Sequence, residues 1–155
     1  MRTRFFAFTL VELMVTVSIF AIMTAVSVPL IMQNRSDQAL SSEAELVKEF
    51  ILKAKNFAQN PENETAEAYL VRRVTSSQVE INRLVGGESF KIDQTLRLGQ
   101  SQIANDFTPI IFKVPSGELS AGQNVDPVEV VVKSLSGRSQ EKTIVASYPG
   151  VVNVR

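Results

Sequence analysis

Residues Arg2–Ile31 read RTRFFAFTLVELMVTVSIFAIMTAVSVPLI, a run that is apolar almost throughout but contains one glutamate, Glu12. No charged side chain follows from Leu13 to Met32. In a helix, about 20 such residues rise about 30 Å, which is the thickness of the hydrocarbon core of a bilayer. A carboxylate at one end of such a span costs free energy unless another group pairs with it. The run therefore predicts a membrane-spanning helix whose glutamate has a partner.

The composition of the chain limits the functions open to it. Its 155 residues suffice for one domain and an extension, and its 16 basic and 16 acidic residues leave no net charge to attract nucleic acid. The sequence contains no cysteine and no histidine. It therefore lacks disulfides, thiol nucleophiles, the usual general base and the usual zinc ligands. We expect neither an enzyme with catalytic residues nor a metal or cofactor site.

A second segment, residues 36–60, has the pattern of an amphipathic helix that ends before Pro61. Its apolar residues recur at helical spacing and are Leu40, Ala44, Val47, Phe50, Ile51, Ala54, Phe57 and Ala58. The link to the first run contains neither glycine nor proline, so we expect one helix from Phe8 to Asn60. Pro29 lies inside this helix and removes one backbone hydrogen bond, which predicts a kink there.

From about residue 67 onward the sequence has the pattern of β-strands. The stretch FKIDQTLRL, residues 90–98, alternates between apolar and polar side chains, which is the period of a strand with one buried face. Further β-branched runs are QVEINRLV, FTPIIFKV, PVEVVVKSL, KTIVASY and VVNVR. Turns between them are predicted at Gly86-Gly87, Ser136-Gly137 and Pro149-Gly150. We therefore expect an α+β fold in which an antiparallel sheet packs on the amphipathic helix.

The N-terminal run has three interpretations. A plain membrane anchor explains its length but not Glu12. An ordinary secretory signal peptide explains the basic start and the small-x-small site at Ala25-Val26-Ser27. Against a signal peptide, the apolar stretch exceeds the usual core of about 7–15 residues and continues into a helical pattern.

The third interpretation is a resemblance carried by AFTLVELMVTVSIFAIMTAVSVP, residues 7–29. This stretch resembles the N-terminal signal of type IV prepilins and type II secretion pseudopilins. In that family a basic leader precedes a small residue, then Phe, Thr, Leu, an aliphatic residue, Glu and Leu, with a proline near the twenty-second mature position. Here Pro29 falls 21 residues after Phe8. The chain departs from the family at Ala7, where glycine is usual.

The resemblance implies a processing site and an answer to the question that Glu12 raises. It implies cleavage by a prepilin peptidase between Ala7 and Phe8, followed by N-methylation of Phe8. Glu12 would then be an assembly or registration charge that pairs with the amino terminus of Phe8 in a neighbouring subunit or in its own. The partners implied are other pilin or pseudopilin subunits, an inner-membrane assembly platform and, before assembly, membrane lipid.

The second half of the chain is similar to minor pseudopilins and minor pilins of the GspH/FimT type. The residues that carry this likeness are Phe112 and Gly117 before a loop, the strand VEVVVKS, and IVASYPGVVNV around Gly150. It implies a long N-terminal helix packed on a β-rich head, which is the type IV pilin-like fold. The protein would be a structural subunit of a type II secretion pseudopilus or a type IV pilus.

The expected organisation is a leader at 1–7, a transmembrane and filament-core helix at 8–33, and a head at 34–155. Within the head, the amphipathic helix covers about 36–60 and the β-rich part about 67–155. The resemblance implies a single pass through a bacterial inner membrane, with the head outside the cytoplasm, before the subunit enters a filament. The sequence leaves open whether that filament serves secretion, twitching or competence.

A DNA-binding minor pilin for natural transformation is the alternative function. Arg72-Arg73, Arg138 and Lys142 are the basic residues that could contact nucleic acid. Without Arg2 and Arg4 of the leader, however, the chain has 14 basic against 16 acidic residues. A solvated polar face is therefore favoured over a nucleic-acid surface.

Overall fold

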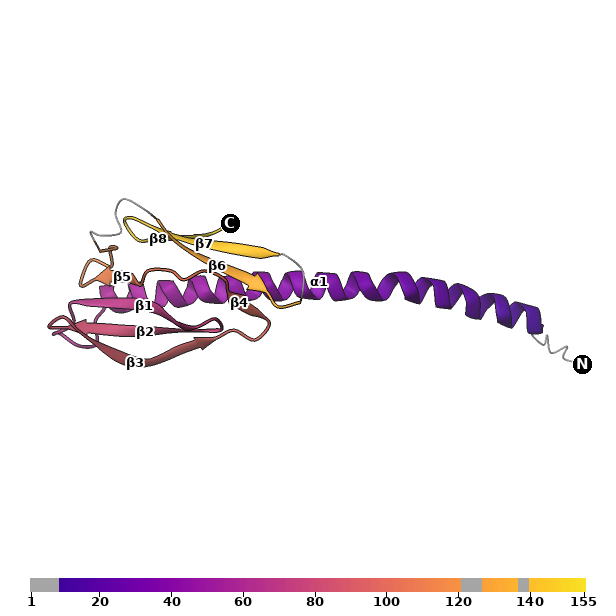
Figure 1. Ribbon diagram of the computed structural model, residues 1–155, viewed down its shortest axis with the longest axis horizontal. Helices are drawn as coiled ribbons and strands as arrows, with labels where there is room; N and C mark the ends of the chain where they lie inside the picture. The colour runs from indigo at the N-terminus through magenta and orange to yellow at the C-terminus, as the bar shows by residue number, and fades with distance from the viewer. Residues whose placement is uncertain (1–8, 121–126, 137–139) are drawn as a thin grey trace, which may run out of the picture. The chain divides into compact units, whose positions relative to one another are not determined.

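The computed structural model describes residues 9–120, 127–136 and 140–155 (Figure 1). The chain divides into two units, one up to Arg35 and one from Ser36 onward. A single helix, α1 (Leu10–Gln59), contributes to both. One long helix followed by antiparallel strands confirms the predicted α+β class. Pro29 lies inside α1, whereas Ala7 and Phe8 lie outside the described residues.

In the first unit, α1 exposes apolar side chains around its whole circumference. The most apolar stretch has a mean hydropathy of 2.2 and buries none of its residues. By length and composition it suffices to cross a membrane. The hydroxyl groups of Thr16, Ser18, Thr24 and Ser27 each donate to a carbonyl three or four residues earlier. Their polar groups are thus satisfied within the helix, as an apolar surrounding requires.

In the second unit, α1 buries one stripe of small and aliphatic side chains. The stripe consists of Leu40, Ala44, Val47, Ile51, Ala54 and Ala58, all of which the pattern predicted. Their spacing of alternately four and three residues places them on one face of a helix. Phe50 and Phe57 lie at the edge of this face and are only partly buried.

The strands form two four-stranded antiparallel sheets rather than one, because strand periodicity does not specify which strands pair. The first sheet has the order β3-β2-β1-β5 and the second β4-β6-β7-β8. The first is built from β1 (Ala68–Thr75), β2 (Gln78–Val85), β3 (Glu88–Arg97) and β5 (Ile110–Lys113). The second is built from β4 (Ser101–Ile103), β6 (Val128–Ser134), β7 (Glu141–Ser147) and β8 (Val151–Val154).

Both sheets contribute to one hydrophobic core with the second half of α1, alongside which they run in Figure 1. In the first sheet, Val71 pairs with Ile81 on one side and Ile110 on the other. In the second sheet, Val130 pairs with Ile144. All five side chains are buried. The two sheets therefore share the apolar face that α1 provides.

The alternation in residues 90–98 produces less burial than its pattern suggests. Leu98 is buried, Ile92 and Leu96 are partly buried, and Phe90 remains 45% exposed. β3 is an edge strand, which pairs on one side only with β2. An alternating pattern reports which side chains share a face, but not how completely that face is covered.

Candidate functional site

The N-terminal end of α1 contains a local cap that involves Glu12. The backbone N–H of Glu12 donates to Thr9 Oγ1 at 3.2 Å, and the N–H of Leu13 donates to the Thr9 carbonyl at 3.1 Å. Thr9 is thus the N-cap and Glu12 the third helical residue, which is the Thr-x-x-Glu spacing of a capping box. The acidic side chain also lies in the first helical turn, where the helix dipole favours negative charge. This local signal was readable from the sequence, but it was missed.

The exposed Glu12 side chain remains available to a second group. The predicted cleavage and methylation site, Ala7 and Phe8, lies outside the described residues. The pairing of Glu12 with an amino terminus therefore stays a prediction, as does the kink at Pro29.

Two glycines singled out by the resemblance meet near the C-terminal end of α1. Gly117 and Gly150 have φ angles of +68° and +114°, which L side chains rarely adopt. A Cβ atom on Gly150 would lie 2.9 Å from the carbonyl oxygen of Gly117, and one on Gly117 would lie 2.5 Å from Cγ of Gln59. Lys55 Nζ donates to the Gly150 carbonyl at 3.0 Å. The two turns and the helix end therefore approach too closely for larger residues.

Phe112, the other residue of that likeness, is fully buried on β5. It pairs with Tyr69 of β1 and forms an isolated bridge to Leu119, beyond the turn that contains Gly117. Phe112 thus anchors the turn that Gly117 makes possible.

Glu43 connects α1 to the start of the second sheet. Its carboxylate accepts hydrogen bonds from the backbone N–H groups of Gly99 and Gln100, both at 2.9 Å, and from Ser101 Oγ. Burial raises the pKa of Glu43, but these hydrogen bonds outweigh burial and hold the pKa below its ordinary value. No sequence pattern links Glu43 to a turn 56 residues away, so this contact could not have been predicted.

Glu80 is a second satisfied carboxylate, only 2% exposed on β2. Arg72 Nε donates to it at 2.7 Å and Lys91 Nζ lies 3.3 Å away. Burial raises the pKa of Glu80, but the two cations outweigh burial and lower it. Arg72 therefore forms an ion pair with Glu80 within the same chain.

Of the other candidate nucleic-acid contacts, one is engaged, one lies outside the described residues and one lines a cavity. Arg73 donates to the Asn105 carbonyl at 2.7 Å and lies 3.7 Å from Asp106. Arg138 lies outside the described residues, and Lys142 lines a small cavity beside α1. The neighbouring arginines thus form no free basic patch, which weakens the DNA-binding alternative. Within the described ranges, no group of three or more acidic residues is placed to hold a metal ion.

The N-terminal segment matches a known family, and the fold is similar to solved structures. Residues 2–28 match the family described as the prokaryotic N-terminal methylation motif. The match covers only the N-terminal segment, which is similar to the signal of type IV prepilin-like proteins.

The fold is similar to that of a minor pseudopilin. The chain is similar to the minor pseudopilin EpsH from the type 2 secretion system of Vibrio cholerae, with a TM-score of 0.53 and 14% identity over 75% of this chain and 95% of EpsH. A crystal structure of EpsH from the same system gives a TM-score of 0.53 and 12% identity, over 76% of this chain and 93% of EpsH. No curated protein sequence matches the chain. The predicted type IV pilin-like fold is confirmed.

Proposed function

We propose that this protein is a minor pseudopilin or minor pilin subunit that is processed, anchored in a membrane and assembled through its N-terminal helix. The observation that carries the proposal is the methylation motif at residues 2–28, which continues into α1 and so into a head with the fold of EpsH. A leader at 1–7 would be removed by a prepilin peptidase between Ala7 and Phe8. Phe8 would then be N-methylated.

Before assembly, residues 8–33 would hold the protein in the bacterial inner membrane with the head, residues 34–155, outside the cytoplasm. The exposed apolar circumference of α1 supports this role, because such a surface is stable only in lipid or among other apolar helices. In the filament, the same surface would pack against neighbouring subunits supplied by the assembly platform. Type II secretion is the favoured system, because EpsH comes from a type 2 secretion system.

Glu12 has a defined electrostatic role in this proposal. Cleavage creates an α-amino group on Phe8, which is largely protonated at neutral pH because its ordinary pKa is about 7.7–8.0. In an apolar filament core the attraction between this ammonium and a carboxylate is much stronger than in water. An incoming subunit in the wrong register would leave both charges buried and unpaired, so the pair selects the register.

Intact-mass analysis of the protein extracted from membranes tests the processing step. We expect the loss of residues 1–7 and the addition of one methyl group to Phe8. The variant Ala7→Gly, which restores the residue usual in the family, should increase the processed fraction. A mature terminus at Val28 would instead identify an ordinary signal peptide and overturn the proposal.

A deletion strain tests the assignment to a system. Loss of the gene should lower the amount of secreted enzymes in the medium, and the wild-type gene should restore it. Normal secretion together with lost twitching or lost DNA uptake would instead assign the subunit to a type IV pilus.

A further inference from the structure

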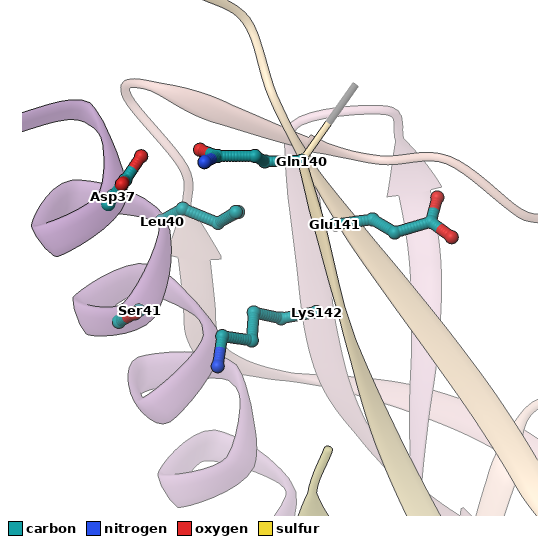
Figure 2. Close-up of a pocket in the computed structure, with 6 residues that line it drawn as sticks. All are labelled: Asp37, Leu40, Ser41, Gln140, Glu141 and Lys142. Atoms are coloured by element: carbon teal, nitrogen blue, oxygen red, sulfur yellow. The ribbon is translucent and has the colours of Figure 1, made fainter. Parts of the chain in front are cut away.

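A small cavity, which we call the notch, lies in the head between the first turns of the second half of α1 and the start of β7. Its lining residues are Asp37, Leu40 and Ser41 of the helix, and Gln140, Glu141 and Lys142 of the second sheet (Figure 2). The cavity has a volume of about 470 Å³, within the range that holds a small ligand or the end of a long side chain. In Figure 2 the side chain of Gln140 points toward Asp37, whereas that of Glu141 points away from the helix.

Two acceptor oxygens at this notch have no donor among the described residues. Asp37 Oδ1 and Gln140 Oε1 are shielded from solvent, and neither accepts a hydrogen bond in the part of the chain that the structure describes. Glu43 and Glu80 differ, because both are satisfied by donors from other elements. Native proteins satisfy the great majority of such buried acceptors, since an unpaired one costs free energy. The notch therefore offers acceptors to a donor from outside the described residues.

Charge and geometry narrow the chemistry of that donor. Asp37 is negative, and among the described residues no ion pair joins it to Lys142, the cation on the opposite wall. In Figure 2 the ammonium of Lys142 lies near Ser41, away from Asp37. A guanidinium keeps its charge and presents five N–H donors in a fixed fork, so one group can serve a carboxylate and an amide oxygen together.

Other classes of ligand fit the notch less well. Calcium requires about six to eight oxygen ligands, and no cluster of acidic residues in the described ranges could hold a metal ion. A phosphate group would be repelled by Asp37. An uncharged donor could bond to the oxygens but would leave the carboxylate without a counter-charge.

We propose that this notch is the docking site for an arginine side chain of a partner protein. The methylene stem of the arginine packs along Leu40, as long charged side chains commonly do on apolar surfaces. Its guanidinium donates to Asp37 and Gln140 after both side chains rotate about their terminal bonds, for which the torsional preference is weak. The rotation brings the two shielded oxygens into the notch.

Nuclear magnetic resonance of the full chain in micelles of an uncharged detergent tests the chemistry. The probes are N-acetyl-arginine amide and its uncharged isostere N-acetyl-citrulline amide, at constant ionic strength. With the arginine compound we expect saturable shifts of the Gln140 side-chain amide and of the Asp37 carboxyl carbon, and with the citrulline compound none. Equal responses to the two probes, no saturable response, or a response to calcium chloride in place of arginine would overturn the proposal.

Three variants localise the binding to the notch. Asp37→Asn should weaken binding of the arginine compound at least about ten-fold, because it removes the charge that the guanidinium meets. Glu141→Gln removes the same charge from a side chain that points away from the helix, and should change binding less than about two-fold. Lys142→Gln should strengthen binding, because it removes a repelling cation. Equal weakening by Asp37→Asn and Glu141→Gln would show that net charge and not the notch attracts arginine.

A photo-reactive residue in producing cells tests the partner class. At position 41, beside the notch, it should cross-link to a peptide of another protein subunit that contains arginine next to the linked residue. Position 42, an exposed neighbour on α1, is the control. A cross-link at position 41 only to lipid, or to peptides without arginine, would overturn the docking of a protein arginine. The titration with the arginine compound needs no filament, so its failure would not count against the proposed subunit function. In the same way, failure of the processing test would not count against arginine binding at the notch.

Discussion

The two halves of α1 belong to one helix but suit different surroundings. Between Leu10 and Met32 the large apolar side chains are exposed on all sides, whereas between Leu40 and Ala58 the buried residues form one stripe. In the first half, serine and threonine hydroxyls bond to their own helix. In the second half, charged side chains reach across to strands and turns. The first half therefore needs an apolar medium or other helices, and the second needs only its own sheets.

The largest effect is expected at Glu12, the one charge in the first half. Glu12→Gln retains the size of the side chain and the spacing of the capping box, which accepts either residue. Membrane insertion and cleavage should persist, but entry into the filament should fail. Removal of one member of a buried ion pair typically costs about 3–5 kcal/mol, and packing among apolar helices gains little over lipid. The measurement is the ratio of filament-associated to membrane-associated protein at equal expression.

Thr9→Ala is the matched control for this variant. It removes the hydrogen bond to the Glu12 N–H and costs about 1 kcal/mol of helix stability, but it keeps the carboxylate. We expect near-normal assembly. If Thr9→Ala fails to assemble while Glu12→Gln succeeds, Glu12 acts as a cap and not as a registration charge.

Two isoleucine-to-alanine substitutions compare the two halves of α1 directly. Ile51 is buried in the core, so Ile51→Ala should lower the free energy of unfolding of the head by about 2–5 kcal/mol through lost contacts and a cavity. Ile19 is exposed in the first half, so Ile19→Ala should leave that free energy unchanged. Hydrogen exchange of strand amides in the full chain, in neutral micelles, measures both. A loss of protection in Ile19→Ala would show that the two halves are coupled.

A smaller effect is expected where the two sheets meet the end of α1. Gly117→Ala should destabilise the head by about 2–3 kcal/mol, because Ala is strained at positive φ and its Cβ would clash with Gln59. Gly86→Ala is the control, since Gly86 has a φ of +58° but nothing within 4 Å of the added atom. It should cost about 1 kcal/mol. Thermal unfolding of the two variants separates strain from clash, and equal shifts would mean that Gln59 simply moves aside.

The sequence was most informative where the signal is local and periodic. The stripe from Leu40 to Ala58 repeats every three or four residues, so its buried face could be read directly. The N-terminal run likewise predicted a helix long and apolar enough to cross a membrane, and α1 has that length and composition. The capping role of Thr9 was local too and could have been recognised from Thr-x-x-Glu.

Contacts between distant segments could not be predicted. The division of the strands into two sheets depends on pairings such as β4 with β6, which no periodicity encodes. The partners of Glu43, and the lack of a donor to Asp37 Oδ1 among the described residues, depend on how α1 packs against segments about 60 and 100 residues away. The exposure of Phe90 depends on how completely other elements cover the face of β3, which is also a property of the whole fold.

Acid should weaken the second half through Glu43 and Glu80. Both have a lower pKa in the folded than in the unfolded chain, so their contribution to stability is present above the unfolded pKa of about 4.5 and is lost as pH falls through the folded value. Glu43→Gln should cost about 1–2 kcal/mol at neutral pH and flatten this dependence below pH ~4.5. Unfolding by urea between neutral and acidic pH measures the effect. A variant with the same acid dependence as the wild type would show that Glu43 is not responsible.

The smallest effect is expected when the first half is removed altogether. Every residue of the hydrophobic core lies at or beyond Leu40, so a chain that begins at Asn34 retains the complete core. Asn34 can cap the shortened helix, and Asp37 then lies near its first turn, where a negative charge is favourable. We expect a soluble head whose melting temperature lies within a few degrees of that of the full chain. A chain that begins at Ser42 is the control: it loses Leu40, which fills the near end of the core, and should be destabilised by about 2–5 kcal/mol. If the chain from Asn34 aggregates or unfolds as readily as the chain from Ser42, the head depends on residues before Asn34, and the contrast between the two halves of α1 does not hold.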